Sequence, residues 1–219
     1  MILQLDETNL IHASNYLATR DEALQKVLER LGPPPLWARK PGFETLIHII
    51  LEQQVSLASA NAAFHKLLRC CPNLTPEHFL SLNDESLGAI GFSRQKIRYT
   101  RLLAEALQSG ELQLDQLNEM DDETVSRYLQ RLKGIGAWTA DIYLMECLLR
   151  PDILPKGDIA LLEAFRDLKG LEKRPDHPNL VDATEHWRPW RSVGVRMLWQ
   201  HYLDARGRPL ILHPPPTNS

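Results

Sequence analysis

Apolar residues recur at three- and four-residue intervals along most of the chain, a spacing typical of amphipathic α-helices. The segment DEALQKVLERL shows the pattern clearly, with its apolar side chains on one face: Ala23, Leu24, Val27, Leu28 and Leu31. The same spacing predicts helices within residues 43–56, 57–68, 75–82, 93–110, 121–132, 137–145, 158–165 and 190–206. No segment alternates as a half-buried strand does. We therefore predict an all-α fold of about ten helices.

Local signals mark where some of these helices begin and end. Ser56 and Thr75 are expected to act as N-caps, and Pro76 then stands at the first helical position. The triple proline after Gly32 ends the helix that begins near Asp21. Residues 172–179, EKRPDHPN, are expected to form a surface loop.

The order of these segments suggests two lobes within a single unit, residues 1–219. We expect the middle of the chain, approximately residues 43–149, to form one lobe. The two ends, approximately 1–42 together with 150–212, would form the other, and 213–219 would be a disordered tail.

The segment LKGIGAWTADIYLM, residues 132–145, breaks the helical pattern and restarts it at once. Its glycines permit backbone angles that are closed to other residues, so the amides of the turn and of the next helix's N-terminus would point outward. Such an array binds an anion, for example one DNA phosphate, without reading sequence. The residues of this hairpin are Lys133, Gly134, Ile135, Gly136 and Ala137. An ordinary connection between two helices would also use glycine, so both interpretations stay open.

Charge is unevenly distributed, although the net charge is only −3. Residues 92–101 and 186–203 carry basic side chains without an acidic one, whereas 111–123 is strongly acidic. The absence of a global basic excess counts mildly against DNA binding, although the local distribution of charge matters more. Each cluster is either a solvated helix face or part of a basic face turned to phosphate.

Composition indicates an ordinary globular protein in a reducing compartment. Hydrophobic residues make up 43% of the chain and charged residues 24%. The three cysteines form no CxxC pair, which disfavours a disulfide framework and a four-thiolate cluster. The first residues lack a signal-peptide pattern, and no apolar run is long enough to span a membrane. We expect a cytoplasmic protein with no membrane partner, associated with the nucleoid if it is bacterial.

Taken together, the blocks ILEQQVS, GFSRQKIRYT, LKGIGAWTA, LPKGDIALLEAF and WRPWRSVGVRMLWQHY resemble the helix–hairpin–helix (HhH-GPD) DNA glycosylase superfamily. They occur in family order between about residues 43 and 202, and the 3-methyladenine DNA glycosylase II type is the most similar branch. The resemblance implies a two-lobed helical fold with a cleft between the lobes. It also implies flipping of a damaged base out of duplex DNA.

Asp158 matches the catalytic aspartate of this family. Cleavage of an N-glycosidic bond builds positive charge on the sugar, which a nearby carboxylate stabilises. The following helix begins here, and its dipole favours a negative side chain. Asp158 also fits a plain N-cap, and the two roles can coexist. Asp141 and Asp152 are rival carboxylates, but neither occupies the family's position.

Aromatic residues are candidates for the base pocket. Trp138 stands where family members that also cut the DNA backbone carry a Schiff-base lysine, so the resemblance implies a monofunctional enzyme without lyase activity. An indole also binds a cationic base well. Trp199 matches a pocket aromatic of the family, and Tyr202 lies three residues on. Each of the three could equally be a core residue.

Other tryptophans receive weaker assignments. Trp187 and Trp190 are expected to pack, with Trp190 the weaker alternative for the pocket, and Trp37 receives no role.

The segment LEQQVS lies where the family inserts a side chain into the space left by the flipped nucleotide. Gln54 matches that wedge best and Val55 less well, while Gln53 and Ser56 would support the loop. A polar residue at the end of a helix is the plainer alternative.

The histidines form no ligand set, and His48 with Glu52 reads as an ordinary i, i+4 pair. We expect no catalytic metal and no required cofactor. The family suggests that the hairpin carbonyls of Leu132 and Gly134 could hold a monovalent cation. No cysteine follows Cys147, so the iron–sulfur branch of the family is disfavoured.

These features lead to a functional hypothesis: a monomeric, monofunctional DNA glycosylase that acts in base excision repair. It would remove alkylated purines from double-stranded DNA, chiefly 3-methyladenine and also 7-methylguanine. The alternatives are a non-catalytic helix–hairpin–helix DNA-binding protein and a glycosylase for deaminated or oxidised bases.

Overall fold

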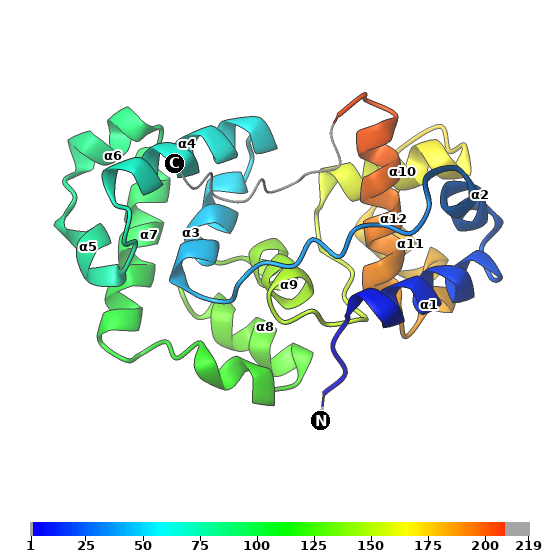
Figure 1. The fold of residues 1–219 in the computed structure, drawn as a ribbon, viewed down its shortest axis with the longest axis horizontal. Helices are drawn as coiled ribbons and strands as arrows, with labels where there is room; N and C mark the ends of the chain where they lie inside the picture. Colours follow the sequence, from blue (N-terminus) through cyan, green and yellow to red (C-terminus); the bar gives the residue numbers. More distant parts are fainter. Residues whose placement is uncertain (1, 209–219) are drawn as a thin grey trace. The chain divides into compact units, whose positions relative to one another are not determined.

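The computed structural model describes residues 2–208, and these residues form helices joined by short connections, without a β-strand (Figure 1). The predicted all-α fold is confirmed. The α-helices are α1 (Glu7–Ala18), α2 (Glu22–Leu31), α3 (Phe43–Glu52), α4 (Leu57–Cys70), α5 (Pro76–Ser81), α6 (Asp84–Ile90), α7 (Arg94–Gln108), α8 (Asp122–Gln130), α9 (Ala137–Glu146), α10 (Ile159–Lys169), α11 (His177–Ala183) and α12 (Arg191–Asp204). Two short 3₁₀ helices, η1 (Asp115–Glu119) and η2 (Glu185–Trp187), complete the set. The tail expected at 213–219 lies outside the described residues.

The described chain divides into two compact units. One contains Leu3–Ala38 together with residues 144–208, and the other contains Arg39–Tyr143. The boundary after Tyr143 falls inside α9, whereas the sequence-based estimate places it near residue 149. None of the helices in residues 2–208 combines the length and apolar character that crossing a bilayer requires.

Side-chain caps explain where most helices begin. Several N-cap side chains accept a hydrogen bond from a backbone amide of the first turn: Asp6, Asp21, Ser56, Thr75, Asn83, Ser93, Asp121, Asp158 and Asp176. Ser56 and Thr75 cap helices as predicted, and Pro76 stands in the first turn of α5.

Part of the loop predicted at 172–179 is wrong, because α11 begins at His177. Asp176 and Pro178 looked like turn residues, yet the first is an N-cap and the second stands in the first turn, where a missing N–H costs nothing. Helices α1 and α6 also escaped prediction. The first begins with a capping box of Asp6 and Asn9, and the second has only seven residues.

The unit formed by both ends of the chain is built around α12, which contacts α1, α2 and α10. Figure 1 shows α12 with α1 and α2 to one side and α10 beside it. Arg196 is fully buried in this helix and donates to the carbonyls of Leu36, Ser192 and Met145 over 2.6–3.1 Å. Burial lowers the pKa of Arg196 to about 10, and the charge of Glu146 opposes that shift. The buried guanidinium therefore fixes two other backbone segments, at Leu36 and Met145, to α12.

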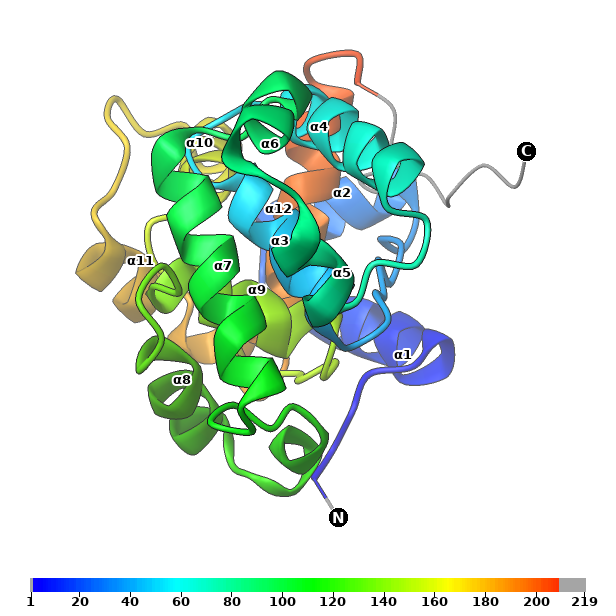
Figure 2. The ribbon, with the colours of Figure 1, turned by 90° about the vertical axis from the view of Figure 1, so that its left-hand side faces the viewer.

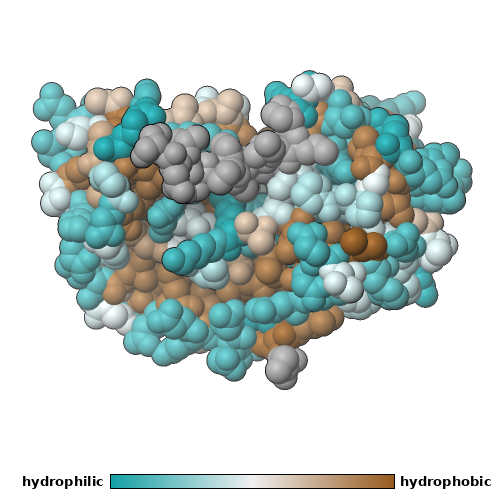
Figure 3. Space-filling model, in the orientation of Figure 1, coloured by the Kyte–Doolittle hydropathy of each residue, from teal (hydrophilic) through white to brown (hydrophobic). Residues whose placement is uncertain are grey.

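In the unit of residues 39–143, α3 contacts α4 and α7, and α7 also contacts α5 and α6 (Figure 2). On the face shown in Figure 3, the outer edge of this unit over α5 and α6 is largely hydrophilic. Leu46, Ile47, Ile49 and Ile50 of α3 are buried completely, which makes α3 the centre of this core.

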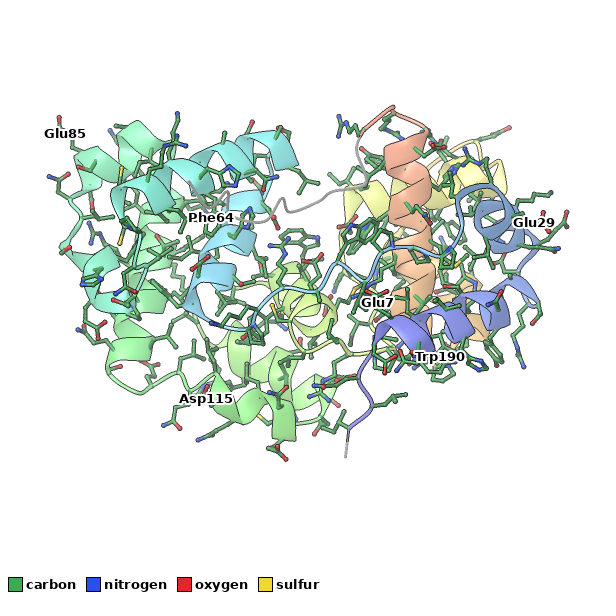
Figure 4. The ribbon with its side chains drawn as sticks, viewed as in Figure 1. Glu7, Glu29, Phe64, Glu85, Asp115 and Trp190 are labelled. Carbon is green, nitrogen blue, oxygen red and sulfur yellow. The ribbon has the colours of Figure 1, made fainter. Side chains whose placement is uncertain are left out.

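His48 and Glu52 of α3 are also buried, so their interpretation as an ordinary surface pair is wrong. Glu52 accepts two hydrogen bonds from Nη2 of Arg39, at 2.9 and 3.0 Å. The His48 ring stacks on Phe64 of α4 with centroids 4.1 Å apart and bonds to Asn61 (Figure 4). These contacts tie α3 to α4 and to the chain that precedes α3.

Asp21 is the most highly connected buried carboxylate in the unit built around α12. It caps α2, lies 2.7 and 2.9 Å from Lys169 Nζ, and accepts from the indole Nε1 of Trp187 at 2.9 Å. Burial by itself raises the pKa of Asp21, but the hydrogen bonds from Lys169 and Trp187 outweigh it and lower the pKa below the ordinary 3.8. The expected packing role of Trp187 agrees with its complete burial.

The hairpin between α8 and α9 packs on α7 through Gly134. Its φ is +106°, and a Cβ there would lie 2.3 Å from Cγ of Tyr99. Gly136 does not share this requirement, because its φ is outside the left-handed region and a Cβ would meet nothing within 4 Å. Of the two glycines, Gly134 therefore uses the backbone freedom that both permit, and Gly136 does not use a positive φ.

Replacement of Asp21 by Asn should destabilise the protein by about 3 kcal/mol at pH 7, because the charged partner Lys169 loses its counterion. Since the folded pKa of Asp21 is depressed, its contribution is complete above 3.8 and disappears as the pH falls through the lower folded value. Urea unfolding of wild type and Asp21→Asn from pH 7 to pH 2.5 measures the difference. A difference that stays constant over this range would contradict the assignment.

Gly134→Ala should cost about 2 kcal/mol or more, because it combines a positive φ with a clash against the Tyr99 ring. Gly136→Ala is the matched control and should unfold within about 0.5 kcal/mol of wild type. Thermal and urea unfolding of the two variants makes the comparison. Equal losses at both positions would show that the Tyr99 contact does not control the hairpin.

Candidate active site

Asp158 is the N-cap of α10, in the unit built around α12. Its Oδ1 accepts the backbone N–H of Leu161 at 2.7 Å and the indole N–H of Trp199 at 3.3 Å. The residue is 8% exposed, and it stands at the start of α10, where the helix dipole places partial positive charge. Two donors on one oxygen fix the side chain's direction, which is the geometry that a stabilising carboxylate needs. The structure thus combines the capping and candidate catalytic roles in one residue.

Trp199 comes from α12 and connects it to α10. Besides its bond to Asp158, it packs against the ring of Trp37, with centroids 6.3 Å apart and planes tilted by 56°. Trp199 is only 7% exposed. Sequence reasoning found Trp199 but missed Trp37, since a lone Trp after three prolines carries no periodic signal.

Tyr202 is half-buried, and its ring face is covered by Arg206, whose guanidinium carbon lies 3.7 Å from the ring centroid. That contact weakens the case for Tyr202 as a stacking surface. Trp190 directly precedes α12 (Figure 4). Its side chain is half-buried, and its backbone N–H donates to the carbonyl of Trp187 at 2.8 Å.

Asp152, one rival carboxylate, is held in ion pairs. Nε and Nη2 of Arg191 donate to its two oxygens at 2.8 and 3.1 Å, and Arg188 donates at 2.5 Å. A carboxylate neutralised by two arginines is poorly placed to stabilise a further cation. These pairs also account for two of the three arginines in the basic cluster that begins at residue 186, and the third is the buried Arg196.

In the other basic cluster, residues 92–101, some cationic side chains bond to other parts of the protein and others are exposed. Nζ of Lys96 donates to the carbonyl of Leu51 at 2.6 Å, and burial lowers the pKa of Lys96 against the opposing charge of Glu52. Arg101 bonds to Asp84. Arg94 and Arg98 are exposed on α7. The charge pattern alone could not separate such internal cations from exposed ones.

The hairpin, in the unit of residues 39–143, presents backbone amides at the start of α9. The first α-type hydrogen bond of this helix runs from the amide of Ala140 to the carbonyl of Gly136. The preceding amides of Ala137 and Thr139 belong to the first turn, whose N–H groups have no acceptor within the helix. This arrangement can bind an anion.

The other hairpin residues divide into structural and exposed ones. Ile135 is 4% exposed, and its amide bonds to the carbonyl of Leu132 at 3.1 Å, so it anchors the turn. Lys133 and Gly136 are exposed, and Trp138 is half-buried in the first turn of α9.

The turn between α3 and α4 lies next to this hairpin. Nε2 of Gln53 donates to the carbonyl of Gly134 and to Oγ1 of Thr139, both at 2.9 Å. Gln54 is exposed with φ +57°, and Val55 is 47% exposed. A positive φ is uncommon for a residue other than glycine. The two bonds from Gln53 attach this turn to the hairpin, which is consistent with the supporting role expected of Gln53.

Within residues 2–208, no three His, Cys, Asp or Glu side chains are grouped so that they could hold a metal ion. The two carbonyls named as cation ligands both accept hydrogen bonds: Leu132 from Ile135, and Gly134 from Gln53. Each carbonyl retains a second lone pair that could reach a cation.

Comparison with known proteins places this geometry in a family. The model of the HhH-GPD superfamily base excision DNA repair proteins matches residues 47–189. DNA-3-methyladenine glycosylase 1 of Schizosaccharomyces pombe is 29% identical over 212 residues, covering 91% of this chain and 93% of that protein. DNA-3-methyladenine glycosylase 2 of Escherichia coli is 24% identical over 200 residues, covering 84% of this chain and 67% of that protein.

Solved structures show the same relationship. The 3-methyladenine DNA glycosylase of Schizosaccharomyces pombe, in complex with abasic DNA, matches with a TM-score of 0.78 and 27% identity over 86% of this chain and 95% of that one. A DNA-3-methyladenine glycosidase of Bacillus halodurans matches with a TM-score of 0.72 and 28% identity over 95% and 94%. Because the family model covers well over half of its length, this chain belongs to the HhH-GPD superfamily of base excision DNA repair proteins.

Proposed function

We propose that this protein is a monofunctional DNA glycosylase that hydrolyses the N-glycosidic bond of alkylated purines in base excision repair. The expected substrates are 3-methyladenine and 7-methylguanine in double-stranded DNA. The family assignment and the 3-methyladenine glycosylases among its relatives support this proposal. The observation that carries it is the environment of Asp158: a buried carboxylate at a helix N-terminus, oriented by an indole N–H.

The chemistry follows from charge. An alkylated purine carries a positive charge, so it leaves as a neutral base and needs little help from a general acid. The sugar becomes cationic as the bond breaks, and the carboxylate of Asp158 stabilises it. A water molecule then adds to the sugar carbon, and the carboxylate can accept its proton.

The remaining residues are assigned to DNA binding. The amides at the start of α9 bind a backbone phosphate, with Lys133 beside them. Gln54, with Val55 next to it, occupies the space left by the flipped nucleotide; their exposure on a turn bonded to the hairpin supports this role. Arg94 and Arg98 are additional exposed cations for phosphate.

Some properties rest on chemistry alone. One lesion needs one base pocket, so a monomer suffices. The hairpin carbonyls of Leu132 and Gly134 remain candidates for a monovalent cation, and the reaction as written needs no cofactor. We place the enzyme in the cytoplasm, where it meets its DNA substrate.

Asp158→Asn should release alkylated bases at least about 100-fold more slowly than wild type, because the negative charge opposite the sugar is lost. Asn caps helices as well as Asp does, so the thermal midpoint should change little. Single-turnover release of 7-methylguanine and 3-methyladenine from methylated duplex measures the effect, with binding to an abasic duplex as the control. Equal release by both proteins would contradict the role of Asp158. Binding without release by either protein would instead identify a non-catalytic DNA-binding module.

The product strand should stay intact after base release, because Trp138 stands where a lyase would carry its amine. Denaturing gels should show strand breaks only after hot alkali, and borohydride should trap no covalent protein–DNA complex. A trapped complex would show that another amine of the chain attacks the sugar.

A further inference from the structure

The coil after α2 is held against α12 at two points. Gln200 donates to the carbonyl of Leu31 at 3.2 Å, and Nε of Arg196 donates to the carbonyl of Leu36 at 2.9 Å. The two donors are four residues apart and therefore share one helix face. The intervening segment contains three consecutive prolines, which restrict its backbone further. Figure 1 shows this coil crossing α12. These bonds and the prolines fix the backbone up to Leu36, and so they restrict the position of the residue that follows it.

That residue is Trp37, and it has an unfavourable backbone conformation. Its φ of +49° is rare for a bulky aromatic residue. Of the three non-glycine residues with positive φ in the described chain, another is Gln54 of the candidate wedge. Such strain persists only where the surroundings enforce it, and it is enriched at ligand-binding positions. Here the enforcing contacts are the bond from Arg196 to Leu36 and the packing of Trp37 on Trp199.

The two tryptophans of this pair, Trp37 and Trp199, differ in burial and in the contacts that they make. Trp199 is almost fully buried, and its N–H is used to orient Asp158. Trp37 is only partly buried, so it offers more aromatic surface than Trp199 does. Because the planes are tilted by 56°, the two indoles form a corner. The Trp199 indole of this corner donates its N–H to the carboxylate of Asp158.

We infer that Trp37 is a specificity-determining residue that contacts the flipped base through the face of its indole. The inference rests on the proposed glycosylase function and extends it. A cationic purine is attracted to an indole face, and Trp is the strongest of the aromatic side chains in this respect. Trp37 therefore favours alkylated, positively charged bases, while Trp199 mainly positions Asp158.

The test compares Trp37→Leu, Trp37→Phe and a control, Tyr16→Leu. Tyr16 is a partly exposed aromatic residue of the same unit, on α1, with Arg20 over its ring at 4.6 Å. Release of 7-methylguanine and 3-methyladenine is measured with saturating enzyme in a single turnover. Affinity for a duplex with a synthetic abasic site is measured in parallel. That duplex has no base to contact Trp37, so its binding reports a merely structural change.

Trp37→Leu should slow release about 10-fold, because leucine has no ring to attract a cation. Trp37→Phe should slow it about 3-fold, because phenylalanine attracts a cation less strongly than tryptophan does. Affinity for the abasic duplex should stay within about twofold of wild type for both, and Tyr16→Leu should match wild type in both assays. Release by both Trp37 variants at the wild-type rate would overturn the inference. A parallel loss of release, abasic-duplex affinity and thermal midpoint would also overturn it, since Trp37 would then be structural. If wild type releases no alkylated base, the proposed function itself fails.

Discussion

The hydrogen bond from the Trp199 indole to Asp158 is the interaction on which the proposed chemistry depends. It joins α12, the central helix of its unit, to the first residue of α10. A carboxylate on a flexible loop could turn toward solvent or toward a nearby cation. Here the amide of Leu161 and the indole of Trp199 hold one oxygen in place, so the negative charge has a defined direction. Electrostatic stabilisation is effective only when the stabilising group need not reorganise during the reaction.

The same unit maintains this arrangement through buried charge. The guanidinium of Arg196 donates hydrogen bonds to backbone carbonyls. The carboxylate of Asp21 accepts hydrogen bonds from Lys169, from Trp187 and from amides in the first turn of α2. Such groups are costly to bury and are tolerated because their hydrogen bonds are satisfied. The bond from Arg196 to Leu36 holds the coil after α2, and hence Trp37, beside Trp199. The position of the aromatic corner is therefore a consequence of the core.

Much of the fold and part of the site could be predicted from the sequence. Periodicity located most of the helices, although not α1, and the caps at Ser56 and Thr75 followed from residue type. Asp158 and the hairpin were found through motif blocks. Trp37 and the burial of His48 with Glu52 could not be predicted, because each depends on contacts between residues distant in sequence. The ion pairs of the second basic cluster could not be predicted either, because Arg188 and Arg191 are more than thirty residues from Asp152 in the sequence.

The Gln53 side chain joins two features that serve different ends. Its amide nitrogen bonds at once to the Gly134 carbonyl in the hairpin and to Thr139 in the first turn of α9. The backbone that exposes Gln54 and Val55 is consequently anchored to the same few residues that supply the proposed phosphate site. If both proposed roles hold, binding one strand and inserting a side chain between base pairs occur together, as one rigid unit. Such a protein would probe the stack wherever it binds, without a separate conformational change to report damage.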